Sequence, residues 1–196
     1  MYNYPLTLTF KVITLGPQIT VTDASGRVVM FVKMKFMKLK EEVTIYADVQ
    51  QTQKLFSINA DRIIDFSARY SFTDSRGMSL GAIRRQGMKS LWRARYDIFE
   101  VGETPVMNIE EESVATRFAD GCLTSIPIVG MFAGYFFHPA FLVSRPDGNV
   151  VMRIQKQPAF FEGKFTIEKL AAVSDLEENR VLLSMLMMTL LERQRG

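Results

Sequence analysis

The C-terminal part of the chain contains a segment that is apolar on every side of a helix. Residues 181–191 read Val-Leu-Leu-Ser-Met-Leu-Met-Met-Thr-Leu-Leu, with no charged face. A helix that is apolar all round must be surrounded by lipid or by protein. At ~1.5 Å per residue this segment covers roughly 16 Å, about half of a ~30 Å hydrocarbon core. The sequence therefore predicts a helix enclosed by protein.

The flanking residues favour a helix with defined ends. Ser174 and Glu177 have the spacing of a capping box, in which each side chain bonds the other residue's free backbone amide. Arg193 and Arg195 follow the apolar segment, where positive charge suits the C-terminal end of the helix dipole.

A turn pattern with Asp and Gly recurs at residues 22–27, 73–78 and 144–149, each time between short runs of strand-forming residues. Further strands are expected at 32–36, 37–40, 43–46, 55–58 and 91–99, and a closing hairpin at 160–168. The alternation changes phase between Phe36 and Met37, which predicts a bulge or a sharp turn there. Many strands followed by one buried helix predict a mainly β fold, namely a closed antiparallel barrel around that helix, because closure also removes exposed strand edges.

Composition bounds the class of protein. A chain of 196 residues, 47% of them hydrophobic, favours one domain over 1–196 with a substantial core. The single cysteine, Cys122, excludes an intramolecular disulfide and suits a reducing compartment. The first residues lack the apolar region of a secretory signal. We therefore expect a cytoplasmic protein, and peripheral attachment to a membrane stays open.

Residues 122–143 form a second apolar stretch, long enough at ~20 residues to span a bilayer. Pro127, Pro139 and several glycines interrupt it, and broken backbone in lipid leaves polar groups unsatisfied. A loop or short helix packed on the barrel is therefore favoured over a transmembrane helix. A third interpretation is a surface patch that contacts a membrane interface, a partner protein or a second copy, formed by Ile126, Ile128, Val129, Met131, Phe132, Tyr135 and Phe136.

Catalytic and metal-binding motifs are absent from the sequence. Nothing around Cys122 or His138 resembles a nucleophile and its base. The carboxylate run Glu110–Glu112 lacks the alternating oxygen ligands of a calcium loop and is typical of a solvated surface or a helix start. The sequence thus predicts a binding protein rather than an enzyme, with no cofactor and no metal.

Basic residues are the strongest remaining signal. Two stretches are rich in them: one from Arg27 to Lys40, and one between Asp74 and Asp97 that contains no acid. Guanidinium groups suit phosphate through paired hydrogen bonds, although a solvated strand face also explains such residues. Nucleic acid is disfavoured because the net charge is only +3 and no row of exposed aromatic residues accompanies the basic ones. The candidate residues for an anionic headgroup are Arg84, Arg85, Lys89, Arg93 and Arg95.

The hairpin at 22–32, the strand at 91–99, the hairpin at 160–167 and the terminal helix together resemble the tubby-like superfamily, and within it the branch of phospholipid scramblases and LURP-one-related proteins. The resemblance implies a twelve-stranded barrel around a central hydrophobic C-terminal helix, with an insertion at about 121–140. It also implies phosphoinositide or membrane binding, as in tubby domains and scramblases.

These observations lead to one hypothesis and one alternative. The hypothesis is a non-enzymatic module that docks on anionic phospholipid surfaces. The alternative is a protein-interaction scaffold or homo-oligomer that uses the apolar residues between 126 and 136.

Overall fold

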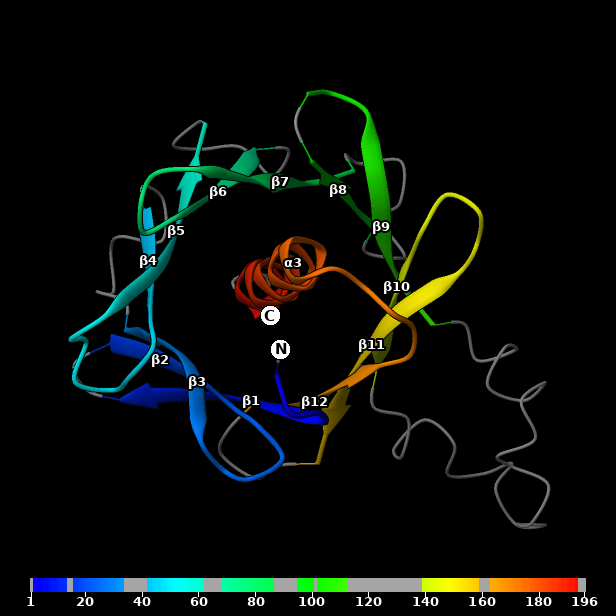
Figure 1. The fold of residues 1–196 in the computed structure, drawn as a ribbon. Coiled ribbons are helices and arrows are strands. Elements are labelled where there is room, and N and C mark those ends of the chain that lie inside the picture. Colours follow the sequence, from blue (N-terminus) through cyan, green and yellow to red (C-terminus); the bar gives the residue numbers. More distant parts are fainter. Residues whose placement is uncertain are drawn as a thin grey trace, which may run out of the picture.

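The computed structural model describes residues 2–13, 16–33, 42–61, 68–86, 95–100, 102–112, 139–158 and 163–193. In these ranges twelve antiparallel strands close into a barrel around one helix (Figure 1). The strands are β1 (Leu6–Ile13), β2 (Gly16–Thr22), β3 (Val28–Lys33), β4 (Glu42–Tyr46), β5 (Lys54–Ala60), β6 (Arg69–Asp74), β7 (Ser79–Arg85), β8 (Arg95–Phe99), β9 (Pro105–Glu111), β10 (Ala140–Ser144), β11 (Val150–Gln157) and β12 (Gly163–Lys169), and the helix is α3 (Asp175–Arg193).

Closure of the barrel depends on the first and last strands. Every strand pairs with its neighbours in the sequence, and β1 also pairs with β12, with Leu8 opposite Phe165. The ring therefore has no free edge that could pair with another chain. This confirms the predicted mainly β barrel with an enclosed helix.

Helix α3 fills the inside of the barrel, where Figure 1 shows it within the ring of strands. Every residue from Val181 to Leu190 is buried. The two hydroxyl groups in this stretch remain satisfied, because Ser184 and Thr189 donate to backbone carbonyls one turn earlier, each at 2.8 Å. The prediction of a helix surrounded by protein is confirmed. Among the described residues, no helix has the combination of length and apolar character needed to cross a bilayer.

The antiparallel order gives the barrel two different rims. Helix α3 ends near the start of β8, where Glu192 bonds Tyr96, so we call this end the C-terminal rim. All odd-numbered strands end there, because neighbouring strands alternate in direction. The opposite end, where α3 begins, is the N-terminal rim, and the turns that follow β2, β4, β6, β8 and β10 lie there.

The three turns recognised in the sequence all lie at the N-terminal rim. Gly26, Gly77 and Gly148 have φ angles of 81°, 83° and 85°, a conformation that favours glycine. In the first two turns Asp23 and Asp74 accept hydrogen bonds from the following backbone amides. These bonds stabilise the turns locally.

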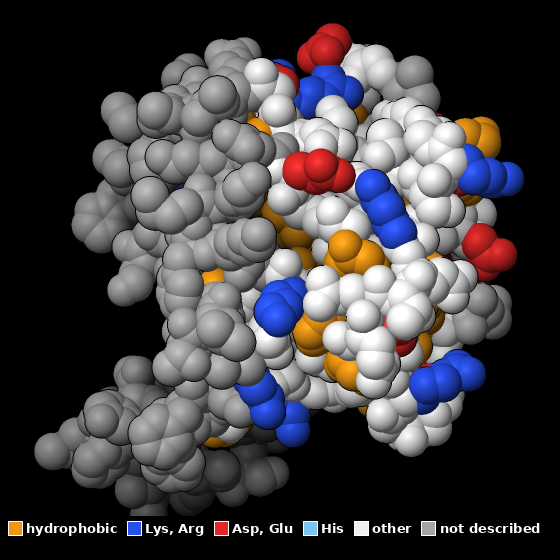
Figure 2. Space-filling view, turned by 90° about the vertical axis from the view of Figure 1, so that its left-hand side faces the viewer, with side chains coloured by type: hydrophobic (Ala, Val, Ile, Leu, Met, Phe, Trp, Pro, Cys, Tyr) orange, Lys and Arg blue, Asp and Glu red, His pale blue; other side chains and the backbone are white. Residues whose placement is uncertain are grey.

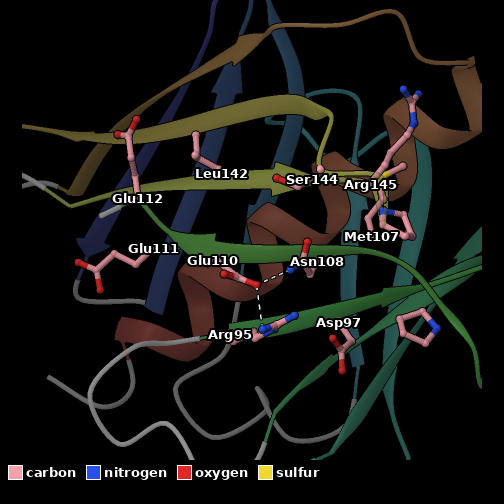
Figure 3. Close-up of a pocket in the computed structure, with 13 residues that line it drawn as sticks. Arg95, Asp97, Met107, Asn108, Glu110, Glu111, Glu112, Leu142, Ser144 and Arg145 are labelled. Atoms are coloured by element: carbon pink, nitrogen blue, oxygen red, sulfur yellow. Dashed lines mark hydrogen bonds and ion pairs between the residues drawn. The ribbon is translucent and has the colours of Figure 1, made fainter. Parts of the chain in front are cut away.

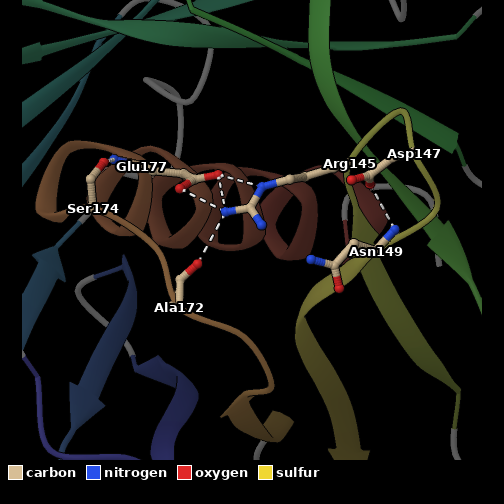
Figure 4. Close-up of polar contacts among 6 residues, drawn as sticks. All are labelled: Arg145, Asp147, Asn149, Ala172, Ser174 and Glu177. Carbon is tan, nitrogen blue, oxygen red and sulfur yellow. Dashed lines mark hydrogen bonds and ion pairs between the residues drawn. The ribbon is translucent and has the colours of Figure 1, made fainter.

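The third turn has Arg145 where the others have aspartate. All three residues make the same two backbone bonds: the amide donates to the carbonyl four residues on, and the carbonyl accepts from the turn glycine. The Arg145 side chain instead reaches across to the start of α3 (Figure 4). It donates to the Glu177 carboxylate at 2.9–3.1 Å and to the Ala172 carbonyl at 3.1 Å.

This contact changes the expected helix cap. Ser174 accepts the Glu177 amide at 3.3 Å, which is one half of the predicted capping box. The Glu177 carboxylate, expected to bond the Ser174 amide, is bound by Arg145 instead. The helix start therefore keeps half of its local cap and is also tied to the barrel wall through Arg145.

Further polar contacts fix the start of α3 in other directions. Glu178 forms an ion pair with Lys169 of β12 at 2.8 Å. Arg180 donates to the Leu80 carbonyl at 2.6 Å and pairs with Glu100, after β8, at 2.8 Å. Charged groups buried in this way stabilise a position only because each one has a partner.

Some expectations need correction. Glu110 and Glu111 belong to β9 and not to a helix start. Of the hairpin expected at 160–168, the described part from Gly163 onward forms one strand, β12, which pairs with β11 and β1, and the first three residues lie outside the described residues. The phase change at Phe36 and Met37, the first part of the strand expected at 91–99 and the insertion at about 121–140 lie outside the described residues.

Gly81 allows the close approach of Arg180 to β7, because a Cβ atom there would lie 2.2 Å from the Phe99 carbonyl oxygen and 2.9 Å from Arg180 Nε. Its φ angle of +125° also disfavours other residues. We expect Gly81→Ala to lower the free energy of unfolding by about 3 kcal/mol. Gly77→Ala, where a Cβ meets no atom within 4 Å, should cost only about 1 kcal/mol. Urea unfolding of both variants measures the difference, and equal losses would contradict the close-contact argument.

The turn aspartates predict a pH dependence. The Ser25 hydroxyl bonds Asp23 and the Met78 amide bonds Asp74, and these bonds lower the pKa of both carboxyls. The two ionised aspartates stabilise the folded protein fully above their unfolded pKa of about 3.9. This contribution to the free energy of unfolding is lost as pH falls through their lower folded pKa. The free energy of unfolding should therefore fall less steeply below about pH 4 in Asp23→Asn/Asp74→Asn than in the wild type. Urea unfolding at several pH values tests this, and parallel curves would refute it.

Candidate functional site

The candidate basic residues of β7 point to opposite sides of the barrel wall. Neighbouring residues of a strand alternate between faces. The Arg84 side chain is 41% exposed on the outer face, whereas that of Arg85 is 10% exposed on the inner face. The structure therefore separates two residues that the sequence grouped together.

Arg85 belongs to a polar cluster beside the end of α3. Its guanidinium lies 3.9 Å from the Glu192 carboxylate and 5.9 Å from the centre of the Tyr96 ring. Tyr96 donates its hydroxyl hydrogen bond to the same carboxylate. Burial, reinforced by Glu192, raises the pKa of Tyr96, so the phenol stays a protonated donor. Arg85 thus stabilises the helix end from inside the barrel.

Arg95 lies on the outer wall at the start of β8. It forms an ion pair at 3.0 Å with Glu110, which is directly opposite it on β9. Asn108 donates to the same carboxylate. The other candidates for headgroup or partner contact lie outside the described residues: Lys89, Arg93, Ile126, Ile128, Val129, Met131, Phe132, Tyr135 and Phe136.

A groove of about 560 Å³ lies on this part of the outer wall (Figure 3). Its sides are β8, β9 and β10, and the turn after β10 borders one end. Asp97 lines the groove and accepts two hydrogen bonds from the Gln86 amide, at 2.9 and 3.1 Å. The described part of the chain holds no group of three or more His, Cys, Asp or Glu side chains that could bind a metal ion.

A second outer cluster joins β6, β7 and the turn after β8. Arg69 and Arg84 are directly opposite each other in register, and both guanidiniums lie over the Phe99 ring, at 4.6 and 5.0 Å from its centre. The Glu103 carboxylate lies 2.6 Å from Arg69 and 3.8 Å from Arg84. Arg69 carries no local signal in the sequence, because only the strand register brings it next to Arg84.

Other parts of the outer surface carry dispersed charge. Figure 2 shows the side of the barrel that includes β4 and β5, where Lys and Arg side chains are interspersed with Asp and Glu. Lys54, for example, lies 3.6 Å from Glu42. The pair of facing arginines on β6 and β7 therefore differs from the mixed charge of this side.

Comparison of the sequence with known families identifies the family of this chain. The sequence model of the family described as LURP-one-related matches residues 28–168, a region that extends from β3 to β12. The chain belongs to the LURP-one-related family. None of the curated proteins matches it.

Comparison with solved structures supports the fold of the chain. The chain is similar to a protein of Arabidopsis thaliana, AT5G01750, whose X-ray structure is known, with a TM-score of 0.51 and 13% sequence identity. The similarity covers 100% of this chain and 94% of that chain. At this identity the comparison shows a shared fold. The family model confirms the resemblance to the LURP-one-related branch of the tubby-like superfamily.

The different positions of Arg84 and Arg85 give a direct test by mutation. Arg85→Ala removes the guanidinium that faces the Glu192 carboxylate inside the barrel. We therefore expect the free energy of unfolding to fall by about 2 kcal/mol. Arg84→Ala removes a half-exposed ion pair and should cost about 1 kcal/mol or less. Urea unfolding measures both, and a larger loss for Arg84→Ala would contradict the assignment.

Proposed function

We propose that this LURP-one-related protein is a non-enzymatic binding module that docks on anionic phospholipid surfaces with its C-terminal rim. The proposal rests on one observation about the barrel. The strand ends that flank 34–41, 87–94 and 113–138 all lie at this rim, because β3, β7 and β9 all end there. Three segments with membrane-binding character in the sequence are thereby attached to one end of the molecule.

The chemistry of these segments suits a membrane surface. Residues 34–41 contain Lys35, Lys38 and Lys40 against Glu41, and residues 87–94 contain Lys89 and Arg93 and no acid. Basic residues close to an anionic surface contribute about 1 kcal/mol each. The third segment supplies the apolar side chains between 126 and 136, which suit the interface below the headgroups.

Arg84 and Arg95 extend this surface onto the outer wall, one on each side of the segment 87–94. Their partners Glu103 and Glu110 have side chains that are 78% and 47% exposed. Ion pairs this exposed contribute little, so a lipid phosphate can replace the carboxylate at small cost. Arg85 is not part of the proposed surface, because it bonds inside the barrel.

The position of α3 favours binding at the outside. Its side chains fill the space enclosed by the strands, from Val181 to Leu190. A ligand inside the barrel would have to displace the helix and break the contacts of Glu177, Glu178 and Arg180. A surface ligand needs no such change.

Vesicle flotation tests the proposal. We expect the protein to float with phosphatidylcholine vesicles that contain phosphatidylserine and not with phosphatidylcholine alone, with binding that weakens as salt rises. Lys89→Gln/Arg93→Gln should weaken binding about tenfold or more, since two basic residues are removed. Lys54→Gln/Arg76→Gln, which removes one lysine and one arginine at the N-terminal rim, is the matched control and should bind like the wild type.

Two results would contradict this function. One is equal recovery with charged and neutral vesicles. The other is a salt-insensitive oligomer in light scattering, which Lys89→Gln/Arg93→Gln leaves intact and which does not bind vesicles. The second result would favour the protein-interaction scaffold that uses the residues between 126 and 136.

A further inference from the structure

The facing arginines on β6 and β7 form an unusual charge arrangement. Arg69 and Arg84 are direct cross-strand neighbours, and like charges in such positions repel each other. The fully buried ring of Phe99 lies beneath both guanidiniums and holds them by cation–π attraction. The wall thus brings two cations together over a fixed apolar floor.

One carboxylate faces both cations. Glu103 pairs with Arg69 at 2.6 Å and approaches Arg84 at 3.8 Å, and its side chain is 78% exposed. Arg69 also donates to the Gly102 carbonyl at 2.6 Å. Asp61 also lies beside Arg69, because its carboxylate accepts the Arg69 backbone amide at 3.0 Å. Among the described residues, Glu103 is the carboxylate that pairs with both guanidiniums, and it is carried by the turn after β8.

The neighbouring charged groups are engaged elsewhere. Asp97, opposite Arg84 on β8, is 9% exposed and accepts both bonds of the Gln86 amide. Arg95 is paired with Glu110 at 3.0 Å. Glu103 is thus the carboxylate that a competing anion would have to replace.

We propose that Arg69 and Arg84 form a subsite for the phosphomonoester of a lipid headgroup, and that Glu103 occupies this subsite until the lipid arrives. The inference rests on the proposed membrane docking and adds the headgroup that is preferred. Arg69 begins β6 and Arg84 is the second-last residue of β7, so both cations lie toward the C-terminal rim, and Glu103 reaches them from the turn after β8. A phosphomonoester carries a charge of about −1.5 to −2 and three acceptor oxygens, so it can bond both guanidinium forks at once. A phosphodiester, with one charge, satisfies the two cations less well.

The test compares two vesicle types of equal surface potential. One contains phosphatidic acid, which has a phosphomonoester, and the other contains phosphatidylserine, both in phosphatidylcholine. We expect the wild type to bind phosphatidic acid vesicles about tenfold more tightly, because charge-assisted bonds to phosphate are the strong ones. Equal binding would overturn the subsite and leave the proposed function standing, whereas no binding to either would overturn both.

Glu103→Gln gives the most specific result. It removes the competing carboxylate and keeps the size of the side chain, so affinity for phosphatidic acid vesicles should rise about threefold or more. A merely structural role of Glu103 predicts weaker binding instead, which would overturn the proposal. This variant also guards against loss of folding, because misfolded protein does not gain affinity.

Arg69→Gln/Arg84→Gln should abolish the preference for phosphatidic acid. Arg27→Gln/Arg76→Gln, two arginines in turns of the N-terminal rim, is the matched control and should retain it. Arg69→Lys/Arg84→Lys keeps the charge but loses the paired bonds, and it should lose most of the preference. Retention of the full preference in either variant of Arg69 and Arg84 would overturn the proposal.

Inorganic phosphate separates a lipid from a soluble ligand. We expect it to perturb the Arg69 and Arg84 side-chain NH signals in NMR spectra only at millimolar concentration, because it lacks the membrane contacts. Micromolar binding of phosphate alone would assign the subsite to a soluble phosphate ester and overturn the lipid assignment.

Discussion

The structure depends on the burial of an apolar helix inside a closed wall of strands. Twelve strands have inner faces that require an apolar filling, and α3 has no polar face that could remain in water. Each therefore satisfies the other by removing apolar surface from water, the main favourable contribution to folding. Among the described residues, the charged and phenolic contacts between helix and wall lie at the two ends of α3: Arg145, Lys169 and Glu100 at the start, and Tyr96 and Arg85 at the end. They fix the position of the helix along the barrel, because the burial of apolar side chains alone does not select one position.

The parts of this fold that could be predicted are those with a local signal. The apolar stretch from Val181, the Ser174 cap and the Asp-Gly turns were sufficient for the helix and the barrel. β1 was missed although Leu6, Leu8 and Phe10 alternate inward, as their burial shows. β9 was also missed, although Met107 and Ile109 alternate inward. The three glutamates that follow them, Glu110 to Glu112, are typical of a solvated surface and made the strand hard to recognise.

The site residues were harder to predict because they depend on register. Arg84 and Arg85 are adjacent in sequence, yet the side chain of Arg84 lies outside the barrel and that of Arg85 lies inside, and only the pleat of the strand decides which. Arg69 and Arg84 are far apart in sequence and meet through strand pairing. The same pairing makes the connections after β3, β7 and β9 leave from one rim, although they look unrelated along the chain. Charge patterns in a β barrel therefore gain meaning only when strand direction is known.

The order of elements along the chain also affects how the protein is made. Helix α3, which occupies the inside of the barrel, follows all twelve strands in the sequence. The ring can close only after β12 has been made, because β12 pairs with β1. During synthesis on the ribosome the inner faces of the strands are therefore made before α3, the helix that covers them. Contacts of such long sequence separation slow folding. Until α3 has been made, the apolar inner faces of the strands are exposed to water, and exposed apolar surface of this kind favours aggregation.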